Sequence, residues 1–380
     1  MRIGIPAETR PGETRVAATP ETVRKLAGKH QVVVQAGAGL YAAALDEAYA
    51  AAGATVGSAE DALGCDMVLK VRAPNEAERA RMRPGTVVVG MLNPFDSDNL
   101  AAMTASRLTA FALEAAPRIT RAQSMDVLSS QANIAGYKAV MLAANTYQRF
   151  MPMLMTAAGT VKAARVLIMG VGVAGLQAIA TAKRLGAVIE ASDVRPPVKE
   201  QVESLGAKFI DVPFLTDEER EIAQGVGGYA RQMPADWMRR QGELVHERAK
   251  LADIIITTAL IPGRAAPTLI REETVRAMKP GSVIVDMAIE QGGNCPLTEL
   301  GKTVVKHGVY IIGEPNLAAL VAADASALYA RNVLDFLKLV FDKEDKFVID
   351  REDEIVRATL LCHAGEALRG ETAGGAALRA

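Results

Sequence analysis

The feature that most constrains this chain is a glycine-rich turn between an apolar, β-branched run and a helical run. RVLIM is followed by GVGVAG and then by LQAIATAKRLGA. Gly170, Gly172 and Gly175 have the G-x-G-x-x-G spacing, in which the glycines permit a tight turn, close approach of a pyrophosphate and helix packing. Val173 and Ala174 open a helix whose positive N-terminus attracts phosphate. The turn therefore predicts a Rossmann domain that binds a dinucleotide.

The strand expected after that helix, AVIEASD, ends in an acidic residue, Asp193, 18 residues beyond Gly175. An acidic side chain at this place accepts hydrogen bonds from the adenosine ribose and repels a 2′-phosphate, which favours NAD(H) over NADP(H). Val194 and Arg195 are expected to line the same site. Two alternatives stay open, because Asp193 also suits the cap of the turn before RPP, and a nearby Arg195 can accommodate a 2′-phosphate.

Two further strand ends, TTALIPG (257–263) and DMAIEQGG (286–293), are expected at the same edge of the sheet. Ligands of parallel α/β sheets bind outside the carboxyl ends of the strands. Thr258, Ala259 and Leu260 are therefore predicted to line the nicotinamide side of the site. Both segments also fit ordinary turns between a strand and a helix.

Strand-like and helical runs alternate along most of the chain, which predicts βαβ units with parallel strands. We expect an α/β fold with two Rossmann-like, doubly wound parallel-sheet domains, joined by long helices and with a cleft between them. The first domain is predicted to comprise residues 1–130 together with about 322–380. Residues 131–321 are predicted to form the NAD(H)-binding domain with its linking helix. That helix is expected to run from about 127 to Pro152.

Composition excludes several classes of protein. The chain has 43 basic and 44 acidic residues, so no electrostatic footprint for nucleic acid is present. It shows no signal-peptide pattern and no uninterrupted apolar run of the length of a membrane span, which predicts a cytoplasmic protein. Cys65, Cys295 and Cys362 are widely spaced and are expected to be reduced. The four histidines are scattered, and no metal site is indicated.

A polar segment, RITRAQSMDVLSSQ, precedes the linking helix. Arg118, Gln123, Asp126 and Ser129 lie in it, at the expected mouth of the interdomain cleft, where cofactor sites are common. Alternatively, Asp126 or Ser124 caps the following helix and the arginines are solvated. The residues alone do not decide between these interpretations.

The run RITRAQSMDVLSSQANIAGY, together with the segment around GVGVAG, resembles the NAD(H)-binding component of the proton-translocating nicotinamide nucleotide transhydrogenases. TTALIPG, KPGSVIVDMA, GGNCPL and VAADASALYARN extend the resemblance over nearly the whole chain. The resemblance implies that Arg118, Gln123, Asp126 and Ser129 orient the nicotinamide and that Asp193 holds the ribose. It also implies a mobile loop with Gly225 and Tyr229 that closes over the nucleotide, although a surface loop with a packed tyrosine remains an alternative.

The same resemblance implies the partners. Hydride would pass from NADH on this chain to NADP⁺ on a separate NADP(H)-binding subunit, and a membrane-spanning subunit would translocate protons. The chain is thus expected to be a homodimer that associates peripherally with the cytoplasmic membrane through these partners.

Alanine dehydrogenase belongs to the same family and shares the opening PAETRPGETRVAATPE. Arg15 and Lys70 match residues with which that enzyme holds its substrate. Where it carries a catalytic histidine, this chain has Leu92 and Asn93. Reduction of an imine needs a proton donor, whereas hydride transfer between nicotinamides moves no proton at the reacting carbons. Transhydrogenation is favoured over an amino-acid dehydrogenase and over a nucleotide-binding regulator without turnover.

Overall fold

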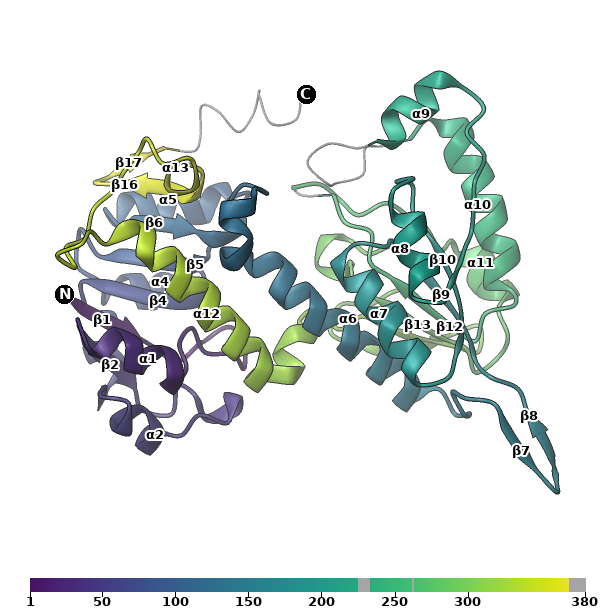
Figure 1. Cartoon of the computed structure of the whole chain (residues 1–380), viewed down its shortest axis with the longest axis horizontal. Coiled ribbons are helices and arrows are strands. Elements are labelled where there is room, and N and C mark those ends of the chain that lie inside the picture. Colours follow the sequence, from purple (N-terminus) through teal and green to yellow (C-terminus); the bar gives the residue numbers. More distant parts are fainter. Residues whose placement is uncertain (225–232, 262, 369–380) are drawn as a thin grey trace. The chain divides into compact units, whose positions relative to one another are not determined.

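A computed structural model describes residues 1–224, 233–261 and 263–368. It divides into two compact units, which are treated separately below. Unit 1 comprises Met1–Gln131 and the chain from Ala318 onward, and unit 2 comprises Ala132–Leu317. Figure 1 shows a sheet with helices packed on it in each unit.

Unit 1 is built on an eight-stranded sheet with the order β17-β16-β6-β5-β4-β1-β2-β3. Its inner strands are parallel and buried on both faces, as expected for continuous apolar runs such as VVV and MVLKV. The strands are β1 (Arg2–Ile5), β2 (Gln31–Gln35), β3 (Thr55–Gly57), β4 (Met67–Arg72), β5 (Val87–Met91), β6 (Thr109–Ala112), β16 (Leu360–His363) and β17 (Glu366–Ala367). The helices are α1 (Pro20–Ala27), α2 (Asp46–Ala51), α3 (Ala59–Leu63), α4 (Glu76–Arg79), α5 (Ser97–Ala105), α12 (Ala322–Val340) and α13 (Glu354–Thr359).

Helix α12 brings the C-terminal portion of the chain back to unit 1. Tyr329, Val333, Phe336 and Val340 lie on one side of it at helical spacing and are buried in the core of unit 1. Among the described residues, one helical stretch, Leu317–Val340, is long and apolar enough to cross a membrane, and 56% of its most apolar window is buried. This burial identifies it as a core helix of unit 1.

Unit 2 is a seven-stranded sheet with the order β11-β10-β9-β12-β13-β15-β14, in which all neighbours except β14 and β15 are parallel. The strands are β9 (Arg165–Met169), β10 (Val188–Ser192), β11 (Lys208–Phe209), β12 (Ile254–Thr257), β13 (Val283–Asp286), β14 (Thr303–Lys306) and β15 (Val309–Ile312). The helices are α6 (Val127–Thr146), whose first turn belongs to unit 1, α7 (Val173–Arg184), α8 (Val198–Ser204), α9 (Asp217–Ala223), α10 (Ala235–Ala249) and α11 (Glu272–Ala277). The predicted α/β class with parallel Rossmann-like sheets is confirmed.

The predicted end of the linking helix is wrong. Helix α6 stops at Thr146, and a two-stranded hairpin follows, β7 (Leu154–Thr156) with β8 (Gly159–Val161). The sequence 150–155 is apolar and suggests a longer helix, but Phe150, Met153 and Met155 are exposed. Pro152 instead packs close to Gly186, where an added Cβ would lie 2.7 Å from the proline Cβ. The edge strands β3, β14 and β17, and β16 between β17 and β6, were also not predicted.

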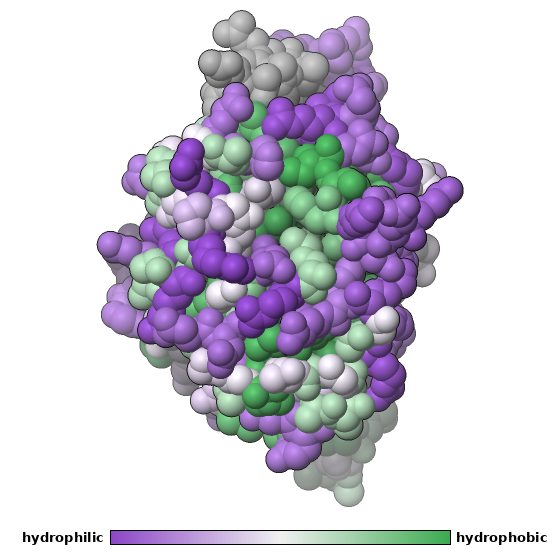
Figure 2. Space-filling model, turned by 90° about the vertical axis from the view of Figure 1, so that its left-hand side faces the viewer, coloured by the Kyte–Doolittle hydropathy of each residue, from purple (hydrophilic) through white to green (hydrophobic). Residues whose placement is uncertain are grey.

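One face of unit 1 carries hydrophobic patches among hydrophilic side chains (Figure 2). Leu40, Tyr41 and Leu45 of unit 1 follow one another in a single loop and are 54–75% exposed. Exposed apolar side chains that gather in this way are typical of surfaces that contact other proteins.

Candidate functional site

The glycine-rich turn lies at the carboxyl end of β9, and its three glycines serve different purposes. Gly170 has φ +94°, and a Cβ there would lie 2.6 Å from Thr258 Oγ1. A Cβ on Gly175 would lie 2.1 Å from the Gly170 carbonyl oxygen, so this glycine lets α7 pack against the turn. Within the described residues, no atom lies within 4 Å of the Cβ position of Gly172, so the backbone there faces open space. A phosphate can therefore approach at Gly172.

Helix α7 begins directly after Gly172, and among the described residues no side chain caps its N-terminus. The backbone N–H groups of the first turn are thus left for an external acceptor, at the positive end of a twelve-residue helix. Gly136 of α6 lies so near this turn that an added Cβ would be 2.2 Å from the Ala174 carbonyl oxygen. Close packing of α6 therefore fixes the start of α7. Both observations suit an anion-binding turn.

Asp193 stands at the end of β10, and its carboxylate is fully engaged within the chain. Oδ2 accepts from Val171 N at 2.7 Å and from Arg195 Nη2 at 2.8 Å. Oδ1 accepts from Arg195 N and Nε, both at 2.9 Å. The side-chain hydrogen bonds that Arg195 donates to Asp193 outweigh the opposing effect of burial and raise the pKa of Arg195. Asp193 thus ties the turn to β10 and neutralises the nearby arginine.

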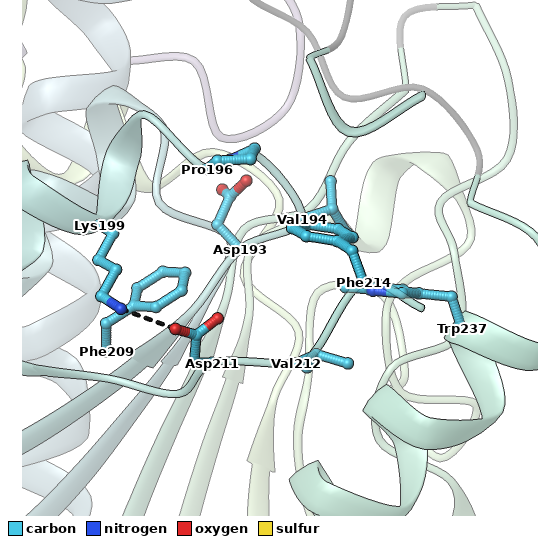
Figure 3. Close-up of a pocket in the computed structure, with 9 residues that line it drawn as sticks. All are labelled: Asp193, Val194, Pro196, Lys199, Phe209, Asp211, Val212, Phe214 and Trp237. Carbon is cyan, nitrogen blue, oxygen red and sulfur yellow. Dashed lines mark hydrogen bonds and ion pairs between the residues drawn. The ribbon is translucent and has the colours of Figure 1, made fainter. Parts of the chain in front are cut away.

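A pocket of about 160 Å³ lies beside Asp193 (Figure 3). Lys199 and Asp211 form an ion pair of 2.7 Å on one side of it, and Phe214 stacks on the buried Trp237 on the other, with ring centroids 6.0 Å apart. Apolar and aromatic surface next to a ribose-type acceptor suits a purine ring. The remaining lining residues are Val194, Pro196, Phe209 and Val212.

Residues at the end of β12 contact the glycine turn from the other side. Thr258 Oγ1 donates to the Gly170 carbonyl oxygen at 2.9 Å, and Thr258 N donates to Met169 O at 2.8 Å. Ala259 N would lie 3.1 Å from a Cβ on Gly170, and Leu260 is 43% exposed. The structure thus brings Thr258 and Ala259 together with Gly170, while Leu260 is exposed.

The RAQSMD segment belongs to unit 1 and not to the unit of the glycine turn. Thr120–Met125 forms a 3₁₀ helix, in which Gln123 is exposed, and Arg118 just before it is exposed as well. Asp126 accepts from Ser129 N at 2.8 Å and from Ser129 Oγ at 2.6 Å. In this structure Asp126 therefore caps the start of α6, as the alternative interpretation expected, while Arg118 and Gln123 lie at the surface.

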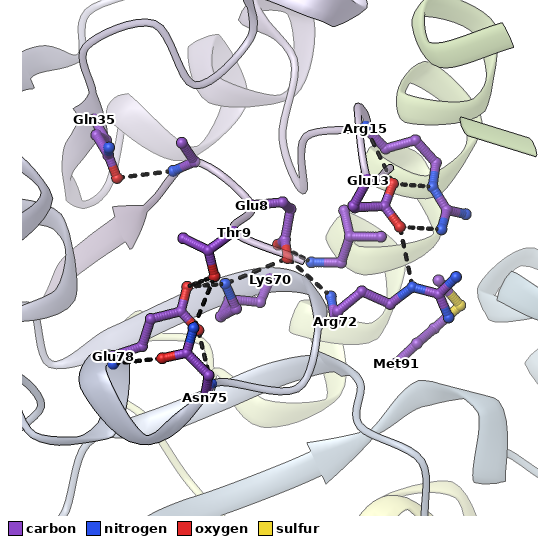
Figure 4. A network of polar contacts seen from close by, with 12 residues as sticks. Glu8, Thr9, Glu13, Arg15, Gln35, Lys70, Arg72, Asn75, Glu78 and Met91 are labelled. Atoms are coloured by element: carbon purple, nitrogen blue, oxygen red, sulfur yellow. Dashed lines mark hydrogen bonds and ion pairs between the residues drawn. The ribbon is translucent and has the colours of Figure 1, made fainter. Parts of the chain in front are cut away.

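Arg15 and Lys70 lie in a network of charged side chains inside unit 1 (Figure 4). Arg15 donates to both oxygens of Glu13, at 2.7 and 2.6 Å, and to Gln131 at 2.7 Å. Lys70 is paired with Glu78 at 2.8 Å and with Glu8 at 3.3 Å, and all these side chains are buried. Burial lowers the pKa of Lys70, but the coulombic attraction of Glu8 and Glu78 outweighs it and leaves the pKa raised.

Two predicted residues, Gly225 and Tyr229, lie outside the described residues. Two residues near the site, Trp237 and Asn294, were not predicted from the sequence, and Asp286 was predicted only as part of the strand end 286–293. Asp286 and Asn294 form a buried pair that contacts the end of β12. For the pair, the hint was a strand ending in aspartate and followed by two glycines. For Trp237, the helix that carries it gave no hint.

Comparison with known proteins links both units to one family. Residues 4–135 match "Alanine dehydrogenase/PNT, N-terminal domain", and residues 139–370 match "Alanine dehydrogenase/PNT, C-terminal domain". The chain is 53% identical to an NAD(P) transhydrogenase subunit alpha protein of Rhodospirillum rubrum, covering 96% of this chain and 97% of that protein.

More distant and structural relatives agree. Alanine dehydrogenase of Mycolicibacterium smegmatis is 29% identical, over 90% of this chain and 88% of that one. A transhydrogenase structure from Sinorhizobium meliloti superposes with a TM-score of 0.87 at 49% identity, over 97% of this chain and 100% of that chain. An L-alanine dehydrogenase structure gives 0.78 at 26% identity, over 97% and 96%.

Proposed function

The chain belongs to the alanine dehydrogenase/PNT family, and from this premise we propose that it is the NAD(H)-binding subunit of a proton-translocating NAD(P) transhydrogenase. In this role it is an oxidoreductase that passes hydride from NADH to NADP⁺ held by a partner subunit. The coupled proton movement takes place in the membrane-spanning subunit.

The observation that carries the proposal concerns unit 1, where the residues expected to hold a substrate are already paired and the expected catalytic histidine is absent. Arg15 and Lys70 are paired with buried carboxylates, and the segment in which the resemblance places the catalytic histidine of alanine dehydrogenase holds Leu92 and Asn93 here. Neither side chain has an ionisable group, so neither can supply the proton that imine reduction needs. Direct hydride transfer between nicotinamides has no such need, and positioning does the catalytic work.

The residues of unit 2 fit NAD(H). The pyrophosphate binds over Gly172 and the uncapped start of α7, where backbone N–H groups and the helix dipole favour an anion. The adenosine end lies beside Asp193, whose oxygens accept the ribose hydroxyls after the Arg195 guanidinium moves aside. When bound, the reduced nicotinamide supplies the hydride. Thr258, Ala259 and Leu260 border the nicotinamide half of the same edge.

Four residues of unit 1, Arg118, Gln123, Asp126 and Ser129, orient the nicotinamide ring in the proposal, and none acts as an acid or base. Gly225 and Tyr229 belong to a loop that closes over the nucleotide. The chain forms a homodimer and associates with the cytoplasmic membrane through its NADP(H)-binding and membrane-spanning partners. The exposed Leu40, Tyr41 and Leu45 are compatible with such contacts.

The test is hydride transfer from NADH to an NADP⁺ analogue, measured for the purified chain with and without an NADP(H)-binding transhydrogenase subunit. We expect transfer only in the mixture. A parallel assay supplies NADH, pyruvate and ammonium to the chain alone. NADH oxidation in that assay without transfer in the mixture would instead identify an alanine dehydrogenase.

The Gln123→Asn variant sharpens the assignment of unit 1. Shortening this side chain by one methylene should slow hydride transfer at least about tenfold while the Kd for NADH changes little, since a misplaced ring is held but does not react. Gln148→Asn, at another exposed glutamine, is the control and should behave like the wild type. Unchanged transfer in Gln123→Asn would remove Gln123 from the site.

A further inference from the structure

The segment GGNCPL, which the glycine turn does not include, makes a tight turn after β13. Gly292 and Gly293 have φ values of +93° and +80°, which L side chains rarely adopt. A Cβ on Gly293 would lie 2.6 Å from Asp286 Oδ2. The two glycines therefore let the chain fold back onto the carboxylate at the end of β13.

Asp286 organises this turn. Its side chain is fully buried, and its two oxygens accept hydrogen bonds of 2.9–3.3 Å from five donors. The donors are Thr257 Oγ1, Ala288 N, Asn294 N, Cys295 N and Thr298 Oγ1. A buried carboxylate with this many donors has its hydration replaced by the protein and fixes the backbone around it.

Asn294, at the end of the turn, is fully buried and uses its whole amide to hold a different segment. Nδ2 donates to Ala259 O at 2.9 Å and to Pro267 O at 2.8 Å. Oδ1 accepts from Ala259 N at 3.2 Å. Both backbone groups of Ala259 are thus paired with one side chain, which fixes the position of this peptide as a neighbouring strand would.

The Ala259 backbone, which Asn294 holds, lies against the glycine turn. Ala259 N lies 3.1 Å from the Cβ position of Gly170, and the adjacent Thr258 Oγ1 donates to Gly170 O. A continuous set of contacts therefore runs from Asp286 through Asn294 and Ala259 to the first glycine of the motif. On its other side the same turn is held by Asp193, through Val171 N.

We propose that Asn294 is a positioning residue of the nucleotide site, which holds the 258–260 segment against the glycine turn so that the turn is formed before NAD(H) binds. The proposal rests on the proposed function, because it assumes that the turn binds NAD(H). When a ligand must order its own binding surface, the free energy of ordering is subtracted from the binding free energy and the affinity falls. Asn294 keeps the segment ordered before NAD(H) binds, so this cost is avoided. Its role is in affinity and not in hydride transfer.

A residue of purely structural importance at the opposite end of the same strand provides the matched control. Asp253, which immediately precedes β12, is buried, accepts from Arg165 N at 2.8 Å and pairs with Lys279 at 2.8 Å. It lies at the amino end of the sheet, away from the glycine turn. Asp253→Asn should therefore destabilise the fold without changing the nucleotide site.

The experiment compares NADH titrations and denaturant unfolding of the full chain for wild type, Asn294→Ala and Asp253→Asn. We expect both variants to be less stable, but only Asn294→Ala to bind NADH more weakly, by about tenfold or more. In the reconstituted transfer assay, Asn294→Ala should raise KM for NADH and leave kcat nearly unchanged. Equal NADH affinity of folded Asn294→Ala and wild type would overturn the proposal, as would a loss of affinity of the same size in Asp253→Asn.

A second variant keeps the proposal testable if Asn294→Ala does not fold. Thr258→Val conserves shape but removes the hydrogen bond to Gly170 O, so it interrupts the same contacts nearer the nucleotide. We expect about threefold weaker NADH binding, and an unchanged Kd would again overturn the proposal. Failure of the proposed function is distinguishable, because the wild-type chain would then either not bind NADH or bind it without passing hydride to the NADP(H)-binding subunit.

Discussion

The two units differ in whether the polar groups that suggest a ligand site are already paired within the chain. In unit 1, the guanidinium of Arg15 and the ammonium of Lys70 are buried and closed off by Glu13, Glu8 and Glu78. In unit 2, the N–H groups at the start of α7 have no side-chain cap among the described residues, and the Gly172 backbone borders open space. In unit 1, the cations that suggest a substrate site therefore stabilise the fold. In unit 2, the backbone N–H groups at the start of α7 are available to a ligand.

The contrast separates the roles of polar groups in the two units. A buried cation that is already paired contributes little to a new ligand, because the ligand must first displace a carboxylate at a desolvation cost. An uncapped helix end carries no such competitor. If the contrast is correct, charge in unit 1 supports stability and the open edge of unit 2 supports binding.

The largest effect is expected for Lys70→Met. The change leaves Glu8 and Glu78 buried without their cation, which should lower the free energy of unfolding by about 3–5 kcal/mol. Denaturant unfolding measures the loss. Lys29→Met, which removes an exposed lysine paired with Asp345, should cost less than about 1 kcal/mol.

NADH titration of the folded Lys70→Met chain then separates the units. We expect the Kd of the wild type, because Lys70 is paired with carboxylates of unit 1 and the glycine turn belongs to unit 2. If the Lys70→Met chain is folded but has lost affinity for NADH, the charged network of unit 1 contributes to NADH binding. The proposed difference between the two units would then be wrong.

The next effect is a pH dependence from Glu114, which contacts the backbone of Asn93. Its Oε1 accepts from Asn93 N at 2.7 Å, and its buried Oε2 has no hydrogen-bond partner among the residues that the structure describes. Burial, opposed by smaller backbone hydrogen bonds, raises the pKa of Glu114 from 4.5 to about 7. The folded chain therefore keeps a proton that the unfolded chain has released between these pH values.

Stability should accordingly fall as the pH rises from about 4.5 to 7, by at most about 3 kcal/mol from this group. Unfolding of Glu114→Gln across this range should be flatter than that of the wild type, since its amide does not titrate. Glu47→Gln, at an exposed position in α2, is the control for the loss of one acidic residue. A wild-type slope retained in Glu114→Gln would assign the pH dependence to another group.

How far the sequence predicts the molecule depends on the distance over which each contact acts. The glycine turn and Asp193 were predicted because their geometry follows from a short stretch of chain around β9 and β10. The hydrogen bonds between Asn294 and Ala259 join residues that are 35 positions apart in the sequence, and no local sequence pattern predicts that the Asn294 amide is buried there. The pairing of β16 with β6, about 250 residues earlier, is a tertiary contact of the same kind.

Local patterns also failed where an apolar residue is exposed. The run 150–155 has the composition of a buried helix, but four of its apolar side chains face solvent in and before the β7–β8 hairpin. The pairing of Arg195 with Asp193, in contrast, spans two residues. The sequence suggests a role for each partner alone, and only the fold shows that each neutralises the other.

That pair gives the third prediction, a change of cofactor selectivity in Asp193→Asn. The amide cannot hold the Arg195 guanidinium as an ion pair, which frees a cation for a 2′-phosphate. We expect about tenfold weaker NADH binding and a smaller ratio of NADPH to NADH dissociation constants. Asp217→Asn, which removes an exposed carboxylate paired with Arg220 and does not line the pocket, should leave both constants unchanged. Unchanged selectivity in Asp193→Asn would show that Arg195 does not face the ribose.

The smallest effect is spectroscopic and requires no substitution. Trp237 is the single tryptophan of the chain, is buried, and stacks on Phe214 in the pocket beside Asp193. If the adenosine end binds there, ADP-ribose should change the Trp237 emission as it saturates the site, and NADH should add quenching because reduced nicotinamide absorbs the emitted light. N-acetyltryptophanamide, titrated identically, corrects for absorption by the ligands. A response to NADH with none to ADP-ribose would mean that the emission senses only the nicotinamide and that the adenosine lies away from the pocket.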